Sequence, residues 1–294
     1  MKCGFVSIVG RPNVGKSTLL NSILGLKLAI TSNVSGTTRD IIQGIYTDSD
    51  SQIIFVDTPG VHKPMHKLDT IMNRRSYDNT EGVDVILFLI DATSPFGKGD
   101  EFILNRVKDS NIPIFLIINK IDKVKDKTLI LNQINSLKDK YNFSEIIPIS
   151  SLKNKLYDLI STLKKYLPEG ESIYSDEDLT NVSTRFIVSE FVREKILELT
   201  HDEIPHTVYC VTNDYKESKD KIYVSVDIII DRENLRKIII GKHGSMLKEI
   251  GTRSRIDIEK FLNKKVFLET HVKVVKDWRD NASILSEFGF NDDE

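Results

Sequence analysis

The segment GRPNVGKS at residues 10–17 constrains the fold more than any other part of the chain. It follows an apolar, strand-like run, Phe5–Val9, and precedes a stretch of helical character, Lys16–Leu24. A glycine turn in this position wraps phosphates with its backbone N–H groups, while its lysine reaches the outer phosphate oxygens and its hydroxyl binds Mg²⁺. A chance glycine turn would lack this context. The segment predicts a nucleotide-binding α/β domain whose phosphate loop consists of Gly10, Arg11, Pro12, Asn13, Val14, Gly15, Lys16 and Ser17.

Short apolar runs recur up to about residue 166, and helical stretches such as Asp126–Tyr141 separate them. Fully apolar strands that alternate with helices are typical of a mostly parallel sheet covered on both faces. Such sheets bind ligands beyond the carboxyl ends of their strands. The runs and the polar residues that follow them are Ile53–Val56 before Asp57, Val85–Ile90 before Asp91, and Ile114–Ile118 before Asn119.

The segment NKID at residues 119–122 predicts which base is bound. The carboxylate of Asp122 can accept hydrogen bonds from the ring N–H and the exocyclic amine of guanine, whereas adenine offers neither donor there. Sites that depend on such a bond reject the analogue without it by a factor on the order of 10⁴–10⁵. We expect Asn119 to tie this segment to the phosphate loop, the stem of Lys120 to cover the base, and Ile121 to complete the GTP contacts. A solvated turn is the alternative, and the buried strand before the segment favours the nucleotide site.

Three further segments complete the expected site. Asp57 of DTPG would hold Mg²⁺ through water, and the Gly60 N–H would meet the γ-phosphate. Thr38 of GTTRD, residues 36–40, would donate its hydroxyl and carbonyl to Mg²⁺. Two serines after Ile146–Ile149 would offer backbone N–H groups to the guanine oxygen. We therefore expect GTP contacts from Asp57, Thr58, Pro59, Gly60, Val61, Ser150 and Ser151, catalytic roles for Lys16, Thr38, Asp57 and Gly60, and Mg²⁺ binding by Ser17 and Thr38.

Two residues bear on the rate of hydrolysis. Val61 follows DTPG, at the position where a glutamine would orient the attacking water. Because valine cannot hydrogen-bond that water, we expect slow hydrolysis or dependence on another group. Two interpretations of Asn13 stay open, since it could bind a K⁺ ion that acts in place of an arginine finger or could only stabilise its loop.

Residues 166–180, YLPEGESIYSDEDLT, are acidic and rich in turn-forming residues, as is typical of a linker. We expect a GTP-binding domain over 1–168, a linker over 169–182, and a smaller α+β domain with a carboxyl-terminal tail over 183–294. In the second domain, helical spacing over Thr184–Leu199 precedes two strand-like runs, His206–Thr212 and Lys221–Ile230. The segment NDYKESKD between the runs is interpreted as a hairpin loop, and Val266–Lys273 as a final strand.

A second glycine loop, GKHG at 241–244, lacks the Lys-Ser/Thr pair that a nucleotide loop needs. It lies between two helical stretches, Leu235–Ile240 and Ser245–Ile250, and a helix–GxxG–helix unit clamps about four single-stranded nucleotides in KH domains. Residues 236–279 carry twelve Lys or Arg and five Asp or Glu, a net charge of +7, although the whole chain has a net charge of −2. This local charge favours RNA over an ordinary helix–turn–helix. We expect RNA contacts from Gly241, Lys242, His243, Gly244 and Lys248, and mostly buried side chains for Ile238, Ile239 and Ile240.

Composition narrows the remaining classes. The longest apolar run is far shorter than the roughly 20 residues of a membrane span, and the amino terminus runs straight into a strand pattern without a signal peptide. Cys3 and Cys210 lie far apart in apolar runs, which favours buried thiols in a reducing compartment over a disulfide. The lone Trp278 is expected in a core or docking role rather than stacked on a base. These features predict a soluble, cytosolic protein.

The combination of GRPNVGKS, GTTRD, DTPG and NKID with GKHGSMLKEIG resembles the Era GTPases, and the resemblance continues through REKILELTHDEIPH and HVKVVKDWR. It implies a P-loop GTPase domain followed by a type II KH domain, with Mg²⁺ as the cofactor of GTP. It also implies a monomer that binds 16S rRNA near its 3′ end, assists assembly of the 30S subunit, and associates peripherally with the inner membrane. Gly36 and Ser151 depart from the residues common in the family, Gln and Ala.

The sequence supports a molecular switch in which GTP and RNA favour the same state of the chain. A GTPase of tRNA modification is one alternative, but no residues are left for the further catalytic domain that it would need. An RNA-binding protein with a vestigial nucleotide site is the other, and the intact Lys16, Ser17, Asp57 and Asp122 argue against it.

Overall fold

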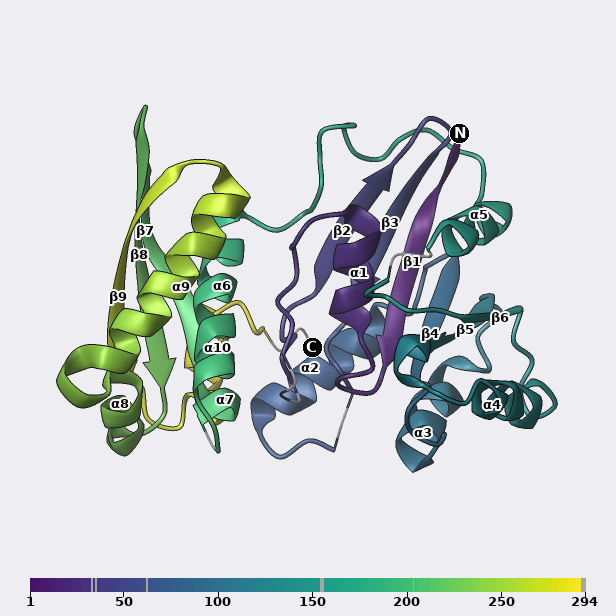
Figure 1. Ribbon diagram of the computed structural model, residues 1–294, viewed down its shortest axis with the longest axis horizontal. Helices are drawn as coiled ribbons and strands as arrows, with labels where there is room; N and C mark the ends of the chain where they lie inside the picture. The colour runs from purple at the N-terminus through teal and green to yellow at the C-terminus, as the bar shows by residue number, and fades with distance from the viewer. Residues whose placement is uncertain (33, 35, 62, 154–155, 203, 292–294) are drawn as a thin grey trace. The chain divides into compact units, whose positions relative to one another are not determined.

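The structure is a computed structural model that describes residues 1–32, 34, 36–61, 63–153, 156–202 and 204–291. The chain folds into two compact units (Figure 1). Unit 1 comprises Met1–Ala29, Gly36–Lys63 and Met72–Asn181, and unit 2 comprises Ile30–Ser35, Pro64–Ile71 and Val182–Glu294.

Unit 1 is built on a six-stranded sheet of order β2-β3-β1-β4-β5-β6. Only β2 is antiparallel to its neighbour, and the other pairs are parallel. Every residue of β3 and of β5 is buried, which requires cover on both faces of the sheet. This confirms the mostly parallel sheet predicted from the apolar runs. The strands are β1 (Lys2–Gly10), β2 (Ile42–Thr47), β3 (Ser51–Asp57), β4 (Val85–Asp91), β5 (Ile114–Asn119) and β6 (Glu145–Pro148).

Helices follow most of these strands, as in other α/β sheets of this class (Figure 1). They are α1 (Lys16–Leu24), α2 (Lys67–Asp78), α3 (Lys98–Val107), η1 (Ile121–Lys123), α4 (Thr128–Lys138) and α5 (Tyr157–Tyr166).

The strand ends bring the predicted polar residues together. Asp57 is the last residue of β3, Asp91 of β4 and Asn119 of β5. Asp91 pairs in register with Asn119, and Asp57 with Ile8 of β1, just before the glycine loop. Parallel strands end at the same edge of a sheet, so this edge is where the site forms.

The acidic segment after α5 is held against the strands of unit 1. Thr180 forms a bridge with Gly44 of β2. The buried side-chain oxygen of Gln52 accepts hydrogen bonds from the N–H groups of Ile173 and Tyr174, at 2.8 and 2.9 Å. The segment interpreted as a linker therefore belongs to unit 1, although little in it is apolar.

Unit 2 has a three-stranded sheet of order β7-β8-β9, with β8 antiparallel to β7 and parallel to β9. The succession of helices and strands confirms the predicted α+β KH-type domain. The elements are α6 (Thr184–Leu199), α7 (Ile204–Thr207), β7 (Tyr209–Glu217), β8 (Lys221–Ile230), α8 (Glu233–Ile240), η2 (Lys242–Gly244), α9 (Ser245–Leu262), β9 (Lys265–Val274), η3 (Trp278–Asp280) and α10 (Ala282–Glu287).

The hairpin loop predicted over NDYKESKD was wrong for most of its length. Strand β7 continues to Glu217, and Tyr215 pairs with Val224 of β8. The Ser218 N–H donates to the Lys221 carbonyl at 2.9 Å, which closes a much shorter turn. Cross-strand pairing overrides the polar composition here.

The core of unit 2 includes Trp278, whose side chain is fully buried. Its Nε1 donates to the Thr207 carbonyl at 2.8 Å, and its ring packs against Tyr209. This confirms a core role rather than base stacking. Cys3 and Cys210 are buried thiols, each in its own unit. Within the described residues, no helix is both long and apolar enough to span a membrane.

Candidate functional site

The Gly10–Ser17 loop joins β1 to α1, and its backbone is shaped for close approach. Gly15 has φ +103° and Asn13 φ +64°, both in the left-handed region. The Lys16 side chain is buried, and its Nζ donates to the carbonyls of Gly10 and Arg11 at 3.1 and 3.2 Å. Because α1 begins at Lys16, its free N–H groups face the same loop. The loop thus offers backbone donors and one ammonium to an anion.

Three oxygen-bearing side chains meet at one end of this loop. The Ser17 hydroxyl donates to Asp57 Oδ2 at 2.7 Å and lies 2.8 Å from the Thr38 hydroxyl oxygen. Asp57 is fully buried, and its Oδ1 makes no hydrogen bond within the described part of the chain. Hydroxyl and carboxylate oxygens are the ligands that Mg²⁺ takes in proteins, so this donor set fits that ion.

Burial strongly shifts the pKa values of the two ionisable side chains at this end of the loop, Asp57 and Lys16. Burial raises the pKa of Asp57 to about 6, and the nearby Lys16 only partly offsets this. Burial lowers the pKa of Lys16 to about 8, against the opposing effect of Asp57. A bound cation and a bound phosphate would each favour the charged form of the neighbouring side chain.

The segment after Asp57 lies against the phosphate loop. A Cβ added to Gly60 would lie 2.9 Å from Pro12 Cγ and 3.0 Å from the Pro12 nitrogen, so only glycine fits without displacement. Thr58 donates its hydroxyl to the Ile8 carbonyl at 2.9 Å, and the Pro59 carbonyl accepts a bond from Ser76. Val61 is buried in the apolar core of unit 1, so its side chain is not directed at water.

The other end of the loop meets the predicted guanine segments. Asn119 Nδ2 donates to the Val14 carbonyl at 2.9 Å, as predicted for the residue that ties NKID to the loop. Asn119 Oδ1 accepts from the N–H and hydroxyl of Ser151 at 3.0 and 2.9 Å. The Ser150 hydroxyl donates to Asp122 Oδ1 at 2.6 Å, and this bond holds the pKa of Asp122 below its usual value. Asp122 is therefore poised as an ionised acceptor.

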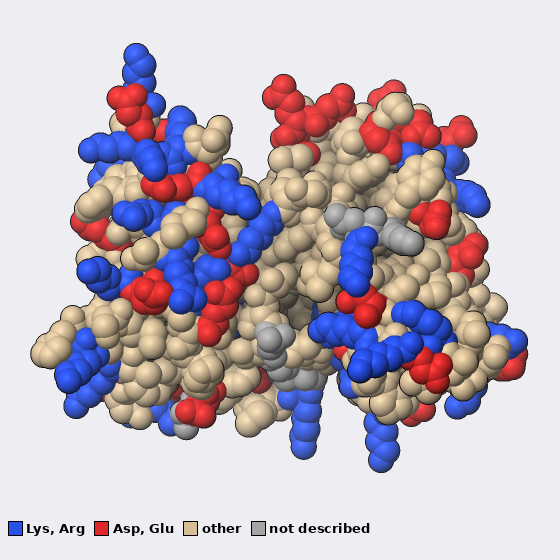
Figure 2. All heavy atoms as spheres, in the orientation of Figure 1, with Lys and Arg blue, Asp and Glu red and all other residues tan. Residues whose placement is uncertain are grey.

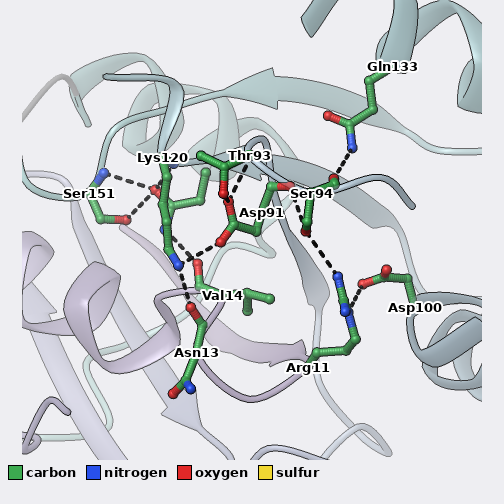
Figure 3. Close-up of polar contacts among 11 residues, drawn as sticks. Arg11, Asn13, Val14, Asp91, Thr93, Ser94, Asp100, Lys120, Gln133 and Ser151 are labelled. Atoms are coloured by element: carbon green, nitrogen blue, oxygen red, sulfur yellow. Dashed lines mark hydrogen bonds and ion pairs between the residues drawn. The ribbon is translucent and has the colours of Figure 1, made fainter. Parts of the chain in front are cut away.

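Lys120 reaches across from NKID to the phosphate loop. Its Nζ donates to the Asn13 carbonyl at 2.5 Å and to Asp91 Oδ2 at 2.7 Å (Figure 3). Ile121, the next residue, begins η1 and bonds through its N–H to the Ile149 carbonyl. From the sequence, Asp91 is predicted only as the polar residue after a strand. The structure pairs it with Asn119 in the sheet, which places it in the site.

The side chain of Arg11 is turned away from the loop, toward α3. Its Nε donates to the fully buried Asp100 at 2.7 Å, and its Nη2 to the Ser94 hydroxyl at 3.3 Å (Figure 3). Arg11 therefore offers its backbone, not its charge, to a phosphate. Sequence reasoning missed Asp100 because its contact with Arg11 is long-range.

The second glycine loop lies between α8 and α9 in unit 2. Gly241, His243 and Gly244 have φ values of +73°, +52° and +78°. A Cβ on Gly241 would lie 2.7 Å from Met246 Cβ, which makes this a position of close approach. Lys242 and His243 are exposed at the tip of the loop. The backbone is thus open to an extended polyanion.

Basic side chains continue from this loop along α9. Figure 2 shows Lys and Arg side chains, interspersed with acidic ones, over the face of this helix. Ile239 is buried and Ile240 half-buried, but Ile238 is 50% exposed, so the expectation that most of these isoleucines are buried was wrong. The buried residues of α8, Leu235 and Ile239, are four positions apart on one stripe of the helix, and Ile238 lies to the side of that stripe. The exposed basic residues of α9 are Lys248, Arg253, Arg255 and Lys260.

Comparisons with known proteins cover both units. A family model described as a 50S ribosome-binding GTPase matches residues 5–120, and a KH domain model matches residues 203–279. A crystal structure of an Era variant from Aquifex aeolicus bound to GDP and AlF4⁻ is 43% identical, with a TM-score of 0.95, over 99% of this chain and 100% of that one. This chain belongs to the Era family of GTPases.

A second crystal structure, of Era with MgGDPNP and nucleotides 1506–1542 of 16S ribosomal RNA, is also 43% identical, with a TM-score of 0.95 over 99% of each chain. The Era family resemblance drawn from the sequence motifs is confirmed over almost the whole chain. Both halves of the Era fold, the P-loop GTPase domain and the KH domain, are present here.

Proposed function

We propose that this protein is a GTP-hydrolysing switch that binds 16S rRNA near its 3′ end and assists assembly of the 30S subunit. The observation that carries the proposal is the 43% identity to Era over 99% of the chain, because it spans the nucleotide loop and the GKHG loop together. The proposed GTP contacts are residues 10–17, 57–61, 119–122, 150 and 151.

The geometry of unit 1 supports GTP at the Gly10–Ser17 loop. Phosphates would lie on the backbone N–H groups of the loop and on Lys16, and the guanine edge would meet Asp122. Ser17 and Thr38 would hold Mg²⁺ directly, with Asp57 acting through water. When bound, the ion would neutralise charge on the phosphates. Gly60 would supply an N–H to the γ-phosphate.

Slow hydrolysis is part of the proposal. Val61 is buried among apolar side chains, so it cannot orient a water molecule. We propose that K⁺ stimulates the reaction and that Asn13, an exposed residue of the phosphate loop, binds it. The test is the rate of phosphate release with K⁺ or with Na⁺ at equal ionic strength. Stimulation by K⁺ that is lost in Asn13→Ala is expected, and equal rates with both ions would refute this part.

The RNA site proposed for unit 2 is the loop between α8 and α9. Gly241 and Gly244 would admit the RNA backbone, and Lys242, His243 and Lys248 would add charge to it. In the related structure, Era itself is bound to nucleotides 1506–1542 of 16S ribosomal RNA. A fragment with that sequence is therefore the natural ligand to try.

The experiment measures the affinity of the intact protein for this fragment. Lys242→Asp with His243→Asp should weaken binding at least about 100-fold at moderate salt while leaving GDP binding unchanged, because phosphate contacts dominate such affinities. Lys138→Asp with Asn142→Asp makes the same change in net charge at exposed positions of unit 1 and should have little effect. Equal losses in the two double variants would show that the RNA site is elsewhere.

We also propose, from the family resemblance, a GTP-binding domain over 1–168 and a KH domain over 183–294, with 169–182 as a connecting segment whose residues up to Asn181 belong to unit 1. The boundary between units after Asn181 supports the start of the KH domain near residue 183. A cytoplasmic location stays a prediction from composition, and peripheral association with the inner membrane and a monomeric state stay predictions from the resemblance.

A further inference from the structure

Asp91, at the end of β4, contacts the lysine that is proposed to cover the guanine base. Its Oδ2 accepts a hydrogen bond from Lys120 Nζ at 2.7 Å, and the two side chains are only 15% and 24% exposed. We propose that Asp91 is a positioning residue for guanine nucleotides, which holds Lys120 over the base site before the nucleotide arrives. This inference rests on the proposed binding of GTP by unit 1.

Asp91 is itself held rigidly. Its Oδ1 accepts from the Thr93 N–H at 2.8 Å and from the Thr93 hydroxyl at 2.6 Å (Figure 3). Burial would raise the pKa of Asp91, but the hydrogen bonds from Lys120 and Thr93 outweigh it and hold that pKa below its usual value. The carboxylate is therefore ionised and fixed in orientation when it meets the lysine.

Lys120 needs such a partner because of its length. A free lysine side chain samples many rotamers, and restricting them when a ligand binds weakens the affinity. Lys120 Nζ has two acceptors within the protein itself, the Asn13 carbonyl and Asp91 Oδ2. Without Asp91, the Asn13 carbonyl would be the one acceptor left of these two. The partly buried ammonium of Lys120 would also lose its counter-charge.

The contact between Asp91 and Lys120 links three segments of the site, namely the end of β4, NKID and the phosphate loop. Asp91 pairs in the sheet with Asn119, the residue before Lys120, and the Ala92 N–H donates to the Asn119 carbonyl at 2.9 Å. The Asn13 carbonyl belongs to the phosphate loop. Asp91 therefore fixes Lys120 relative to both the base segment and the phosphate segment, a role that suits a side chain of β4 because β4 lies between β1 and β5.

The test measures the dissociation constant of GDP carrying a fluorescent ribose label. Asp91→Asn removes the negative charge that faces Lys120 and should raise this constant about tenfold, a loss comparable to that of one hydrogen bond to a charged group. Asp126→Asn is the matched control, because Asp126 accepts the same pair of bonds from Thr128, at 2.9 and 2.7 Å, but lies on an exposed turn. The control should change the constant less than about twofold.

A double-mutant cycle separates positioning of Lys120 from a general structural role. In a Lys120→Met background, adding Asp91→Asn should change the constant less than about twofold, since the lysine is gone. Thr93→Val keeps the carboxylate but removes one bond that orients it, and should raise the constant about threefold. Thermal unfolding of each variant reports whether it folds.

An Asp91→Asn effect equal to that of Asp126→Asn, or undiminished in the Lys120→Met background, would overturn the inference. Failure of the wild-type protein to bind GDP would instead refute the proposed function, and the inference with it.

Discussion

Asn119 joins the two ends of the nucleotide site, so Asn119→Ala should damage both stability and affinity. Its side chain is 1% exposed and makes four hydrogen bonds, to the Val14 carbonyl, the Lys120 N–H, and the N–H and hydroxyl of Ser151. At about 0.5–1.5 kcal/mol each, these bonds contribute about 2–6 kcal/mol to the free energy of unfolding. Because such proteins have only about 5–15 kcal/mol in total, a loss of this size is easily measured.

The assay is urea unfolding of the nucleotide-free protein, followed by circular dichroism, with GDP affinity measured in parallel. Asn79→Ala is the control, because the Asn79 side chain makes one local bond, to the Arg75 carbonyl at 2.9 Å; it should lose less than about 1.5 kcal/mol. Asn119→Ala should also bind GDP at least about tenfold more weakly, since the loop and NKID are no longer joined. A change in unfolding free energy below about 0.5 kcal/mol for Asn119→Ala would show that these four bonds do not stabilise the fold.

Three further predictions concern the glycines of the RNA loop, the pH dependence of GTP binding and the need for Mg²⁺. Gly241→Ala places a Cβ 2.7 Å from Met246 Cβ and should weaken RNA binding at least about tenfold in a gel-shift assay. The Cβ of Gly244→Ala would meet nothing within 4 Å, so this variant should lose less affinity. A larger loss in Gly244→Ala than in Gly241→Ala would contradict the close approach assigned to Gly241. The affinity for Mg·GTP, measured by calorimetry, should be greatest at about pH 7. The affinity should fall below about pH 6 as Asp57 takes up a proton, because the complex needs the carboxylate, and it should fall above about pH 8 as Lys16 loses its proton. A flat profile from about pH 5 to 9 would contradict the shifted pKa values of Asp57 and Lys16. Removal of Mg²⁺ with EDTA should abolish phosphate release and weaken GTP binding, and unchanged hydrolysis would exclude the proposed ion site at Ser17 and Thr38.

Local pattern was sufficient to predict which segments come together at the proposed nucleotide site, because these segments are short and lie at strand ends. GRPNVGKS, DTPG and NKID each follow an apolar run, and the parallel sheet brings those ends together. The Asn119 bond to Val14 was predicted from this arrangement and is present.

Long-range packing could not be predicted in the same way. The contact between Arg11 and Asp100 joins residues 89 positions apart, and neither residue type indicates it. The polar segment after α5 is held in part by the buried Gln52, which has no local sequence signal. The extension of β7 to Glu217 depends on its pairing with β8, which composition does not reveal.

In the function proposed here, one polypeptide couples a triphosphate site to an RNA site. The most direct test of this coupling is the affinity of the intact protein for the 16S rRNA 3′-end fragment, measured once with Mg²⁺ and a non-hydrolysable GTP analogue and once with GDP. Coupling predicts a different affinity in the two states, tighter with the GTP analogue, and an equal enhancement of analogue binding by the RNA. Equal RNA affinities in both nucleotide states would contradict coupling between the two sites.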